Sequence, residues 1–330
     1  MGGANRYDAA VIGGGVAGLA AAIRLAELDQ RTVLIEGGTY PSHKVCGEFL
    51  SPEALPILER WGLTPKSQID RALFFAGKRA YTLPLLRPAG SLSRYTLDAH
   101  LASRAAQIGV DVRTSTRVTQ LDPEVQTLTL DSGETLSADA FIVGAGRLAA
   151  TRQPQLPYIG FKAHFEGLDL DGALEMHLFP GAYLGLSNIE NGRANVACIA
   201  RAGTRLPKLP SRLAGARQLF DWMEVKAPTF GPRHPPHWPH TYFVGDAAGT
   251  IAPTCGDGLA MGLTSGILAA EHAAQRDPDA FRRAWNGRYR PRLRWGNLAH
   301  ALAMRPTLAN LFSPIVPSVL RALFARTREE

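Results

Sequence analysis

The sequence of 330 residues contains few cysteines and has no long uninterrupted apolar run. Its three cysteines, Cys46, Cys198 and Cys255, are widely spaced and odd in number, which fits neither a disulfide framework nor a metal cluster. A reducing, cytoplasmic setting is therefore expected, and no metal site is predicted. No Ser-His-Asp arrangement and no zinc-ligand spacing stands out.

Segments that could target or cross a membrane are also missing. The longest uncharged run that is compatible with a helix, residues 258–270, is too short to span a bilayer, and residues 306–320 contain three prolines. The apolar N-terminus does not read as a signal peptide, because a glycine-rich fingerprint begins almost at once and its removal would destroy the fold. We therefore expect no transmembrane helix.

The positive charge of the chain is unevenly placed. The formal net charge is +7, and residues 276–330 hold eleven arginines, no lysine and four acids. One interpretation is an amphipathic surface that attracts anionic lipid and brings the protein to the membrane periphery. The alternative is a pair of packed C-terminal helices whose arginines face solvent. No recognised nucleic-acid-binding motif accompanies the charge, so nucleic acid is not an expected partner, and the oligomeric state stays open.

A glycine-rich segment near the N-terminus is the clearest positive signal. It follows an apolar run at residues 9–12 and precedes a helix-compatible run at residues 19–25, so its glycines lie at a strand-to-helix turn. Such glycines allow a tight turn, approach of the backbone to a pyrophosphate, and close helix packing, while the helix N-terminus favours the phosphates. The residues concerned are Gly13, Gly15, Val16, Ala17 and Gly18.

A second strand at residues 32–36 completes the unit. It ends in Glu36, 18 positions after the last glycine of the turn, near the spacing at which an acid binds an adenosine ribose. The unit does not distinguish NAD from FAD, and a glycine-rich turn in another α/β protein is the alternative. Residues 144–149 also match the glycine-rich nucleotide-binding pattern, as Gly-x-Gly-x-x-Ala. They are not expected to bind a nucleotide, because Pro154 and Pro157 leave too little room for the helix that should follow.

A second glycine-rich segment lies more than two hundred residues further along the chain. Residues 241–246 read as a short buried strand that ends in Asp246, and a helix-compatible run follows at residues 258–270. This arrangement resembles the Gly-Asp motif of glutathione-reductase-type flavoproteins. The resemblance implies FAD, with Asp246 at a ribitol hydroxyl, Gly256 and Gly258 beside the isoalloxazine, and a helix N-terminus that stabilises reduced flavin. The alternative is a buried aspartate that caps a helix.

Between residues 158 and 200 the pattern changes to antiparallel strands with alternating side chains. The alternating residues are apolar Phe161, Ala163 and Phe165 with Lys162, His164 and Glu166 in one strand, and Leu174, Met176 and Leu178 with Glu175, His177 and Phe179 in the next. Such a sheet presents one face to a core and the other to solvent or ligand. We expect His164 and His177 on the solvent face, and a place in the substrate pocket as proton donors is the alternative.

These patterns predict an α/β fold in three parts: a discontinuous Rossmann-like FAD-binding domain, an inserted antiparallel-sheet substrate domain that roofs the flavin, and C-terminal helices. The predicted boundaries are 1–75, 92–153 and 238–275 for the FAD-binding domain, 76–91 and 154–237 for the substrate domain, and 276–330 for the C-terminal helical segment.

Over most of its length the chain resembles the flavoprotein superfamily that contains geranylgeranyl reductases, aromatic-ring hydroxylases and flavin-dependent halogenases. Residues 44–48, Lys-Val-Cys-Gly-Glu, are similar to the Lys/Arg-x-Cys-Gly-Gly/Glu segment of the reductase branch, and residues 179–185 with 195–196 resemble its sheet motif. Residues 93–98 look like the helix start whose arginine, here Arg94, contacts FAD.

Two departures from the superfamily narrow the function. Where the hydroxylases have Gly-Ala-Asp-Gly, residues 144–146 are Gly-Ala-Gly, although Arg152 is present, and this lost aspartate weakens the case for hydroxylation. The halogenase signature Trp-x-Trp-x-Ile-Pro is absent, so halogenation is not expected.

The residues and the resemblance together predict a cofactor site and a few catalytic candidates. The expected FAD contacts are Gly13, Gly15, Val16, Ala17, Gly18, Glu36, Lys44, Cys46, Gly47, Arg94, Val118, Gly144, Gly245, Asp246, Pro253, Gly256, Asp257 and Gly258. The catalytic candidates are Cys46, His164 and Tyr183. A basic neighbour such as Lys44 can lower the pKa of the Cys46 thiol, whereas a small buried apolar role is the alternative. Tyr183 is equally consistent with ordinary sheet packing.

The predicted function is FAD-dependent oxidation or reduction of a hydrophobic small molecule of prenyl, lipid-like or polyketide origin. NAD(P)H or another donor would reduce the flavin, and hydride would pass to or from a carbon-carbon bond. One alternative is an NAD(P)H-dependent monooxygenase that hydroxylates a phenolic substrate. Another is a membrane-associated flavin electron carrier, which the basic C-terminal segment motivates.

Overall fold

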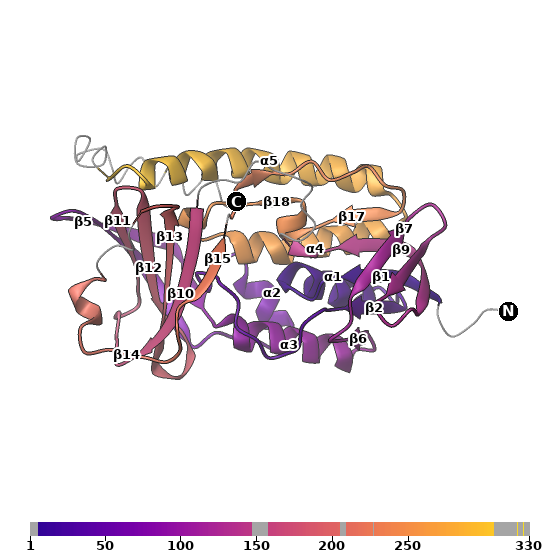
Figure 1. The fold of residues 1–330 in the computed structure, drawn as a ribbon, viewed down its shortest axis with the longest axis horizontal. Helices are drawn as coiled ribbons and strands as arrows, with labels where there is room; N and C mark the ends of the chain where they lie inside the picture. The colour runs from indigo at the N-terminus through magenta and orange to yellow at the C-terminus, as the bar shows by residue number, and fades with distance from the viewer. Residues whose placement is uncertain are drawn as a thin grey trace.

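The structure of the protein, a computed structural model, describes residues 6–146, 158–204, 209–226 and 228–306, together with Ala322 and Arg326. Within these ranges the chain forms two large sheets connected by a helical layer (Figure 1). Arg152, Pro154 and Pro157 lie outside the described residues.

The first sheet is a parallel layer extended by an antiparallel meander. Its strand order is β6-β2-β1-β9-β8-β7, and β17 pairs with the end of β9. The bounds are β1 Arg6–Ile12, β2 Thr32–Ile35, β6 Asp111–Arg113, β7 Val118–Asp122, β8 Thr127–Leu130, β9 Thr135–Val143 and β17 Thr241–Phe243. Because β1, β2, β9 and β17 run parallel, their carboxyl ends share one edge, where the two glycine-rich segments begin.

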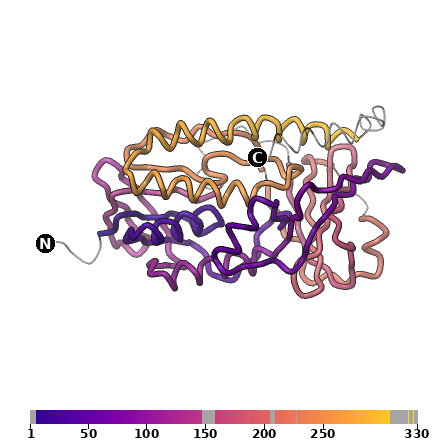
Figure 2. Tube along the Cα trace, turned by 180° about the vertical axis from the view of Figure 1, so that it is seen from behind, coloured from indigo at the N-terminus to yellow at the C-terminus, as the bar shows by residue number. Residues whose placement is uncertain are grey.

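Helices cover one face of this sheet, and the β7-β8 meander covers the other with buried residues such as Leu128 and Leu130. The helices are α1 Val16–Glu27, α2 Leu55–Arg60, α3 Arg94–Gln107, α4 Gly258–Ala274 and α5 Pro278–Ala303. Helix α1, near the start of the chain, lies against α4, near its end (Figures 1 and 2). None of the helices within the described ranges is both long and apolar enough to cross a membrane.

The second sheet is largely antiparallel, in the order β14-β10-β13-β12-β11-β4-β5-β3, with β15 also paired to β10. Its bounds are β3 Phe49–Leu50, β4 Ser67–Ala76, β5 Arg79–Ser91, β10 Tyr158–Glu166, β11 Ala173–Phe179, β12 Ala182–Asn188, β13 Arg193–Arg201, β14 Arg217–Gln218 and β15 Met223–Lys226. Helix α5 extends from the first part of the molecule to this sheet (Figure 1), where Met304, just after its end, accepts a hydrogen bond from Gly181 N.

The side-chain alternation predicted for β10 is present, but the expected solvent face is wrong. Lys162 is fully buried and His164 is only 2% exposed, because this face of the sheet lies against the rest of the molecule. The apolar face carries Ala163 and Phe165, which pack with Leu213 in a separate core. Both faces of the sheet are therefore covered.

One further segment differs from the expected layout. Residues 67–75 were expected within the first domain, yet they form most of β4, which pairs in parallel with β11 of the second sheet. In the basic C-terminal segment, one continuous helix, α5, occupies most of the described part. The division into domains otherwise stays a prediction.

The contact between α1 and α4 gives a first prediction. A Cβ atom on Gly266 would lie 2.2 Å from the carbonyl oxygen of Ala17, so Gly266→Ala should lower the free energy of unfolding by about 1–3 kcal/mol through overpacking. Chemical denaturation measures this loss.

The matched control is Gly287→Ala in α5, where an added Cβ meets nothing within 4 Å. This substitution should raise stability by up to about 1 kcal/mol through helix propensity. A Gly266→Ala protein that is as stable as Gly287→Ala would contradict the close helix contact.

Candidate functional site

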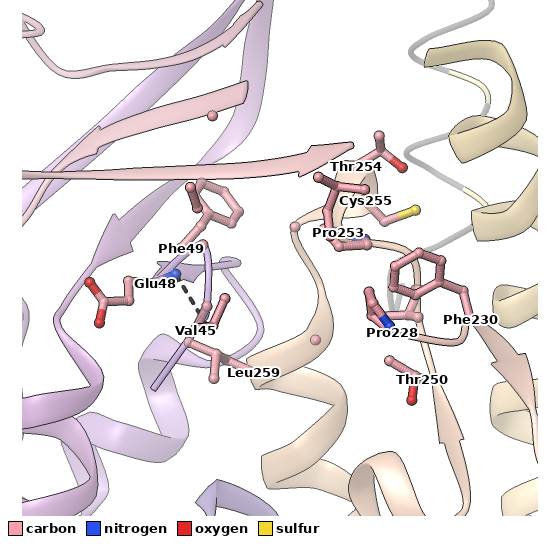
Figure 3. Close-up of a pocket in the computed structure, with 18 of the residues that line it drawn as sticks. Val45, Glu48, Phe49, Pro228, Phe230, Thr250, Pro253, Thr254, Cys255 and Leu259 are labelled. Atoms are coloured by element: carbon pink, nitrogen blue, oxygen red, sulfur yellow. Dashed lines mark hydrogen bonds between the residues drawn. The ribbon is translucent and has the colours of Figure 1, made fainter. Parts of the chain in front are cut away.

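A cavity of about 290 Å³ lies between the second sheet, the loop before β3 and the segment around the start of α4. Figure 3 shows Val45, Glu48 and Phe49 on one side, with Pro228, Phe230 and the turn at residues 253–255 on the other. The residues that line it from the second sheet are Phe49, Ala72, Leu85, Phe161, Leu174, Met176, Tyr183, Gly185, Ala197, Cys198, Ile199 and Val225. Among them, Tyr183 carries the only hydroxyl group.

The first glycine turn has the geometry of a ligand cradle. Gly13 has a φ of +99°, and a Cβ atom there would lie 2.6 Å from Gly144 O, so the chain itself requires this glycine. A Cβ atom on Gly18 would lie 1.9 Å from Gly13 O. A Cβ atom on Gly15 would have as its nearest neighbour a guanidinium nitrogen of Arg94, at 4.0 Å. The space beside Gly15 is therefore open to a ligand, as the pyrophosphate of FAD requires.

Glu36 follows β2 and lies beside this turn. Its carboxylate accepts hydrogen bonds from Gly14 N at 2.6 Å and from Gly38 N at 2.9 Å. The acid that was expected to bind ribose is thus positioned next to the phosphate cradle.

The second glycine-rich segment converges on the first. Gly245 follows β17 with a φ of +55°. A Cβ atom added there would lie 2.9 Å from the methyl group of Ala17, at the start of α1. Gly245 and Asp246 also line the cavity. Two stretches more than two hundred residues apart therefore meet at one site, as an extended dinucleotide such as FAD needs.

The N-terminus of α4 faces the same region, with Gly258 at its first position and Pro253 and Gly256 among the lining residues. Gly256 has a φ of +65°, and a Cβ atom there would lie 2.8 Å from the ring of Phe49. Asp257 does not line the cavity; it is 1% exposed and accepts a hydrogen bond from Ser51 Oγ at 2.9 Å.

Arg94 begins α3 and lines the cavity on the side of the phosphate cradle. Its guanidinium donates to both carboxylate oxygens of the buried Asp98, at 2.7 and 2.6 Å. This bidentate pair fixes the arginine at the place that the resemblance assigns to an FAD contact.

Cys46 lines the cavity, but its thiol is not activated by a basic neighbour as expected. Burial raises the pKa of Cys46 and outweighs the opposing charges of Arg94 and Lys162. The Lys44 side chain is not among the lining groups; its carbonyl oxygen accepts a hydrogen bond from Lys162 Nζ at 3.1 Å. Cys46 therefore stays a neutral thiol.

The remaining expected residues are spread more widely. Gly47 lines the cavity, and Gly144 packs against the glycine turn. Val118, at the start of β7, and His164 are not among the lining residues. His177 lies on the opposite face of the second sheet, stacked on Phe75 with ring centroids 4.5 Å apart.

Sequence reasoning missed two groups beside the cavity. The first is the Glu48 carboxylate, which pairs with Lys162 and lies 2.7 Å from His164 Nε2. The second is His300 in α5, whose Nδ1 lies 3.2 Å from the hydroxyl of Tyr183. The helical spacing of the apolar residues Trp285, Tyr289 and Leu293 could have placed His300 on the buried side of α5.

Burial sets the protonation of the Tyr183 and His300 pair. It raises the pKa of Tyr183 well above its ordinary value, so the hydroxyl keeps its proton. Burial, with the nearby charge of Arg201, lowers the pKa of His300 to about 4, so the imidazole is neutral near pH 7. The pair can hold a hydrogen bond in place but is a weak proton source.

Comparison with known proteins agrees with this geometry. The family described as "FAD binding domain" matches residues 8–47. The chain is 25% identical to a menaquinone reductase of Mycolicibacterium smegmatis over 96% of this chain and 89% of that protein. It is 25% identical to a digeranylgeranylglycerophospholipid reductase of Methanococcus aeolicus over 82% of this chain and 77% of that protein.

A third relative, the FAD-dependent monooxygenase OpS4 of Beauveria bassiana, is 28% identical over 46% of this chain and 39% of its own. Among solved structures, a geranylgeranyl bacteriochlorophyll reductase-like protein from Thermoplasma acidophilum superimposes with a TM-score of 0.78 at 20% identity, covering 95% of this chain and 92% of that chain. The flavin-dependent brominase Bmp2 superimposes with a TM-score of 0.77 at 18% identity, covering 97% of this chain and 93% of the brominase. These structural likenesses show the fold alone.

The matched FAD-binding segment, the converging glycine turns and the two reductases that match most of the chain lead to one conclusion: the chain is an FAD-dependent oxidoreductase, distantly related to the menaquinone and geranylgeranyl-lipid reductases and to FAD-dependent monooxygenases.

Proposed function

We propose that this oxidoreductase reduces or oxidises a carbon-carbon bond of a hydrophobic small molecule with a prenyl or similarly lipid-like chain. The observation that carries the proposal is the cavity wall from the second sheet, which is apolar except for Tyr183 and Cys198. Such a wall favours an alkyl or isoprenoid chain by burial of apolar surface. Two relatives that cover most of the chain are named for reductases of menaquinone and of a geranylgeranyl lipid.

Bound FAD would supply hydride chemistry, and the residues of the chain would bind and orient it. The open space at Gly15 and the N-terminus of α1 suit the pyrophosphate, and Glu36 suits the adenosine ribose. Asp246 suits the ribitol, and the positive end of α4 suits the negative charge of a reduced isoalloxazine. NAD(P)H is the electron donor in this proposal.

Tyr183 provides the polar contact of the apolar wall. In the His300 tautomer that carries its hydrogen on Nδ1, the neutral imidazole donates to the Tyr183 hydroxyl, which keeps its own proton and is suited to donate it in a hydrogen bond to an oxygen atom of the substrate. A lipid with one polar head group next to its chain would satisfy this donor and the apolar surface together.

A phenol monooxygenase is the second candidate, because the chain is 28% identical to the monooxygenase OpS4 over 46% of its length. That reaction inserts an oxygen atom and requires molecular oxygen, whereas reduction of a double bond does not. The two candidates are therefore separated by the product formed with and without air.

A product assay tests the proposal. The FAD-loaded protein is incubated without oxygen with NADPH, or with dithionite in its place, and with a menaquinone that bears an isoprenoid side chain. After any quinol has been reoxidised in air, we expect a menaquinone that still carries two added hydrogen atoms, located in its isoprenoid chain by fragmentation in mass spectrometry. A product that forms only in air and carries an added oxygen would favour the monooxygenase, and oxidation of NADPH with no substrate converted would favour the electron carrier.

The phosphate cradle gives a second test. Because the chain leaves the space at Gly15 open, Gly15→Val should fold as the wild type does but block the backbone from the pyrophosphate. We expect the Kd for FAD, measured by quenching of flavin fluorescence, to rise at least about a hundredfold, which corresponds to about 2.7 kcal/mol. Gly287→Val, at an exposed position in α5, is the control for an added valine, and a yellow, fully loaded Gly15→Val protein would refute the assignment.

The role of Tyr183 can be measured separately. Tyr183→Phe removes one hydrogen bond, which contributes about 1 kcal/mol, so kcat/KM for the lipid substrate should fall about fivefold while the Kd for FAD stays unchanged. Tyr158→Phe is the control, because the ring of Tyr158 packs on His300 at 5.0 Å but does not line the cavity. Equal kcat/KM values for the two variants would remove Tyr183 from substrate binding.

A further inference from the structure

Three titratable side chains are buried together where the second sheet meets the loop before β3. Glu48 and Lys162 are fully buried, and His164 is 2% exposed. Lys162 Nζ pairs with one oxygen of the Glu48 carboxylate, and His164 Nε2 lies 2.7 Å from the other oxygen. The cofactor contacts proposed above do not use any of the three.

The same cluster ties the loop to three elements. Glu48 Oε1 also accepts a hydrogen bond from Arg94 N, at the start of α3, at 2.7 Å. Lys162 donates to the carbonyl oxygen of Lys44 at 3.1 Å, and Asn195 in β13 donates to the carbonyl oxygen of Cys46 at 3.2 Å. Residues 44–48 are therefore held against β10, β13 and α3 at both ends and in the middle.

The backbone of Glu48 is in an unfavourable conformation. Its φ is +55°, which is common for glycine but disfavoured for a residue with a Cβ atom. Such a conformation persists only when surrounding contacts hold it, and here the side chain supplies them. In Figure 3 the Glu48 carboxylate points away from the turn at residues 253–255.

This conformation determines where the neighbours of Glu48 lie. Glu48 N donates to Cys46 Sγ at 3.3 Å, so the thiol is fixed relative to the turn. The ring of Phe49, the next residue, lies 2.8 Å from where a Cβ atom on Gly256 would be. Gly256 stands two positions before the start of α4. One anchored residue thus sets both Cys46 and Phe49 at the wall of the cavity.

We propose that Glu48, with Lys162 and His164 as its partners, is the positioning residue that holds the loop of residues 44–48 against the flavin end of the cavity. A buried carboxylate and a buried ammonium are stable only as a pair, since either one alone would be drawn to water. Loss of the carboxylate should therefore release the loop rather than shift it slightly. That the flavin binds at this end of the cavity rests on the proposed function, whereas protein contacts anchor the loop whether or not the cofactor is bound.

The test measures exposure of Cys46 in the protein without FAD. Alkylation by iodoacetamide is followed by peptide mass spectrometry, with the buried Cys198 and Cys255 as internal references at 3% and 2% exposure. In the wild type the Cys46 side chain is only partly exposed, and its raised pKa slows the reaction. Glu48→Gln keeps the size of the side chain but removes its charge, so we expect Cys46 to be alkylated at least tenfold faster.

The matched control is Glu166→Gln, on the same strand as Lys162. The Glu166 side chain is 35% exposed and pairs with Arg217 at the surface, so the rate for Cys46 should stay at that of the wild type. After FAD is added, Glu48→Gln should also show a kcat at least tenfold lower with little change in KM, whereas Glu166→Gln should keep both values.

A double variant separates positioning from folding. Glu48→Gln with Lys162→Met removes the ammonium that the single variant leaves unpaired, so its unfolding midpoint should return toward that of the wild type. Cys46 should nevertheless stay reactive, because the anchor is still missing.

Wild-type alkylation rates in Glu48→Gln would overturn the proposal. A double variant that regains wild-type stability, kcat and slow alkylation of Cys46 would also overturn it, because the charges would then serve folding alone. Neither alkylation result depends on the substrate, so failure of the lipid assay leaves this test intact.

Discussion

Helices α1 and α4 approach so closely that a single Cβ atom on Gly266 would collide with the backbone of Ala17, and the site depends on this contact. It places the glycine turn after β1 beside the loop after β17, where Gly245 meets the methyl group of Ala17. Parallel pairing of both strands with β9 brings their carboxyl ends to the same edge of the sheet. The helix contact then sets the spacing between the glycine turn after β1 and Asp246.

The features that the sequence predicted well are those whose local structure lies in one short stretch of chain. Gly13, Gly15 and Gly18 occur within six residues between a strand and a helix, and the turn they form is dictated locally. Glu36 is close to them because parallel strands end at the same edge. The structure adds a distinction that a motif does not contain: Gly13 and Gly18 are required by the chain's own packing, whereas the space at Gly15 remains for a ligand.

The parts that sequence reasoning missed depend on partners distant in the chain. Alternation in β10 was predicted, but period-two patterning does not say which face is covered, and Lys162 and His164 are buried against Glu48, more than a hundred positions earlier. The Tyr183 hydroxyl likewise meets His300, 117 positions later. A lowered pKa of Cys46 beside Lys44 was one of two alternatives, and burial raises this pKa instead. Charge in a sequence does not reveal solvation, and solvation decides these cases.

The charges around the cavity are arranged so that an apolar molecule can enter it. Arg94 is paired with Asp98, and Glu48 is paired with Lys162. Because each of these charges is compensated outside the apolar wall, the wall itself can remain free of ionic groups, which would otherwise oppose burial of a hydrocarbon chain. The same pairs stiffen the loop and the helix start that flank the cofactor region. The loop at residues 44–48 therefore carries one compensated charge, Glu48, between the Arg94–Asp98 pair at the start of α3 and the apolar residues of the second sheet.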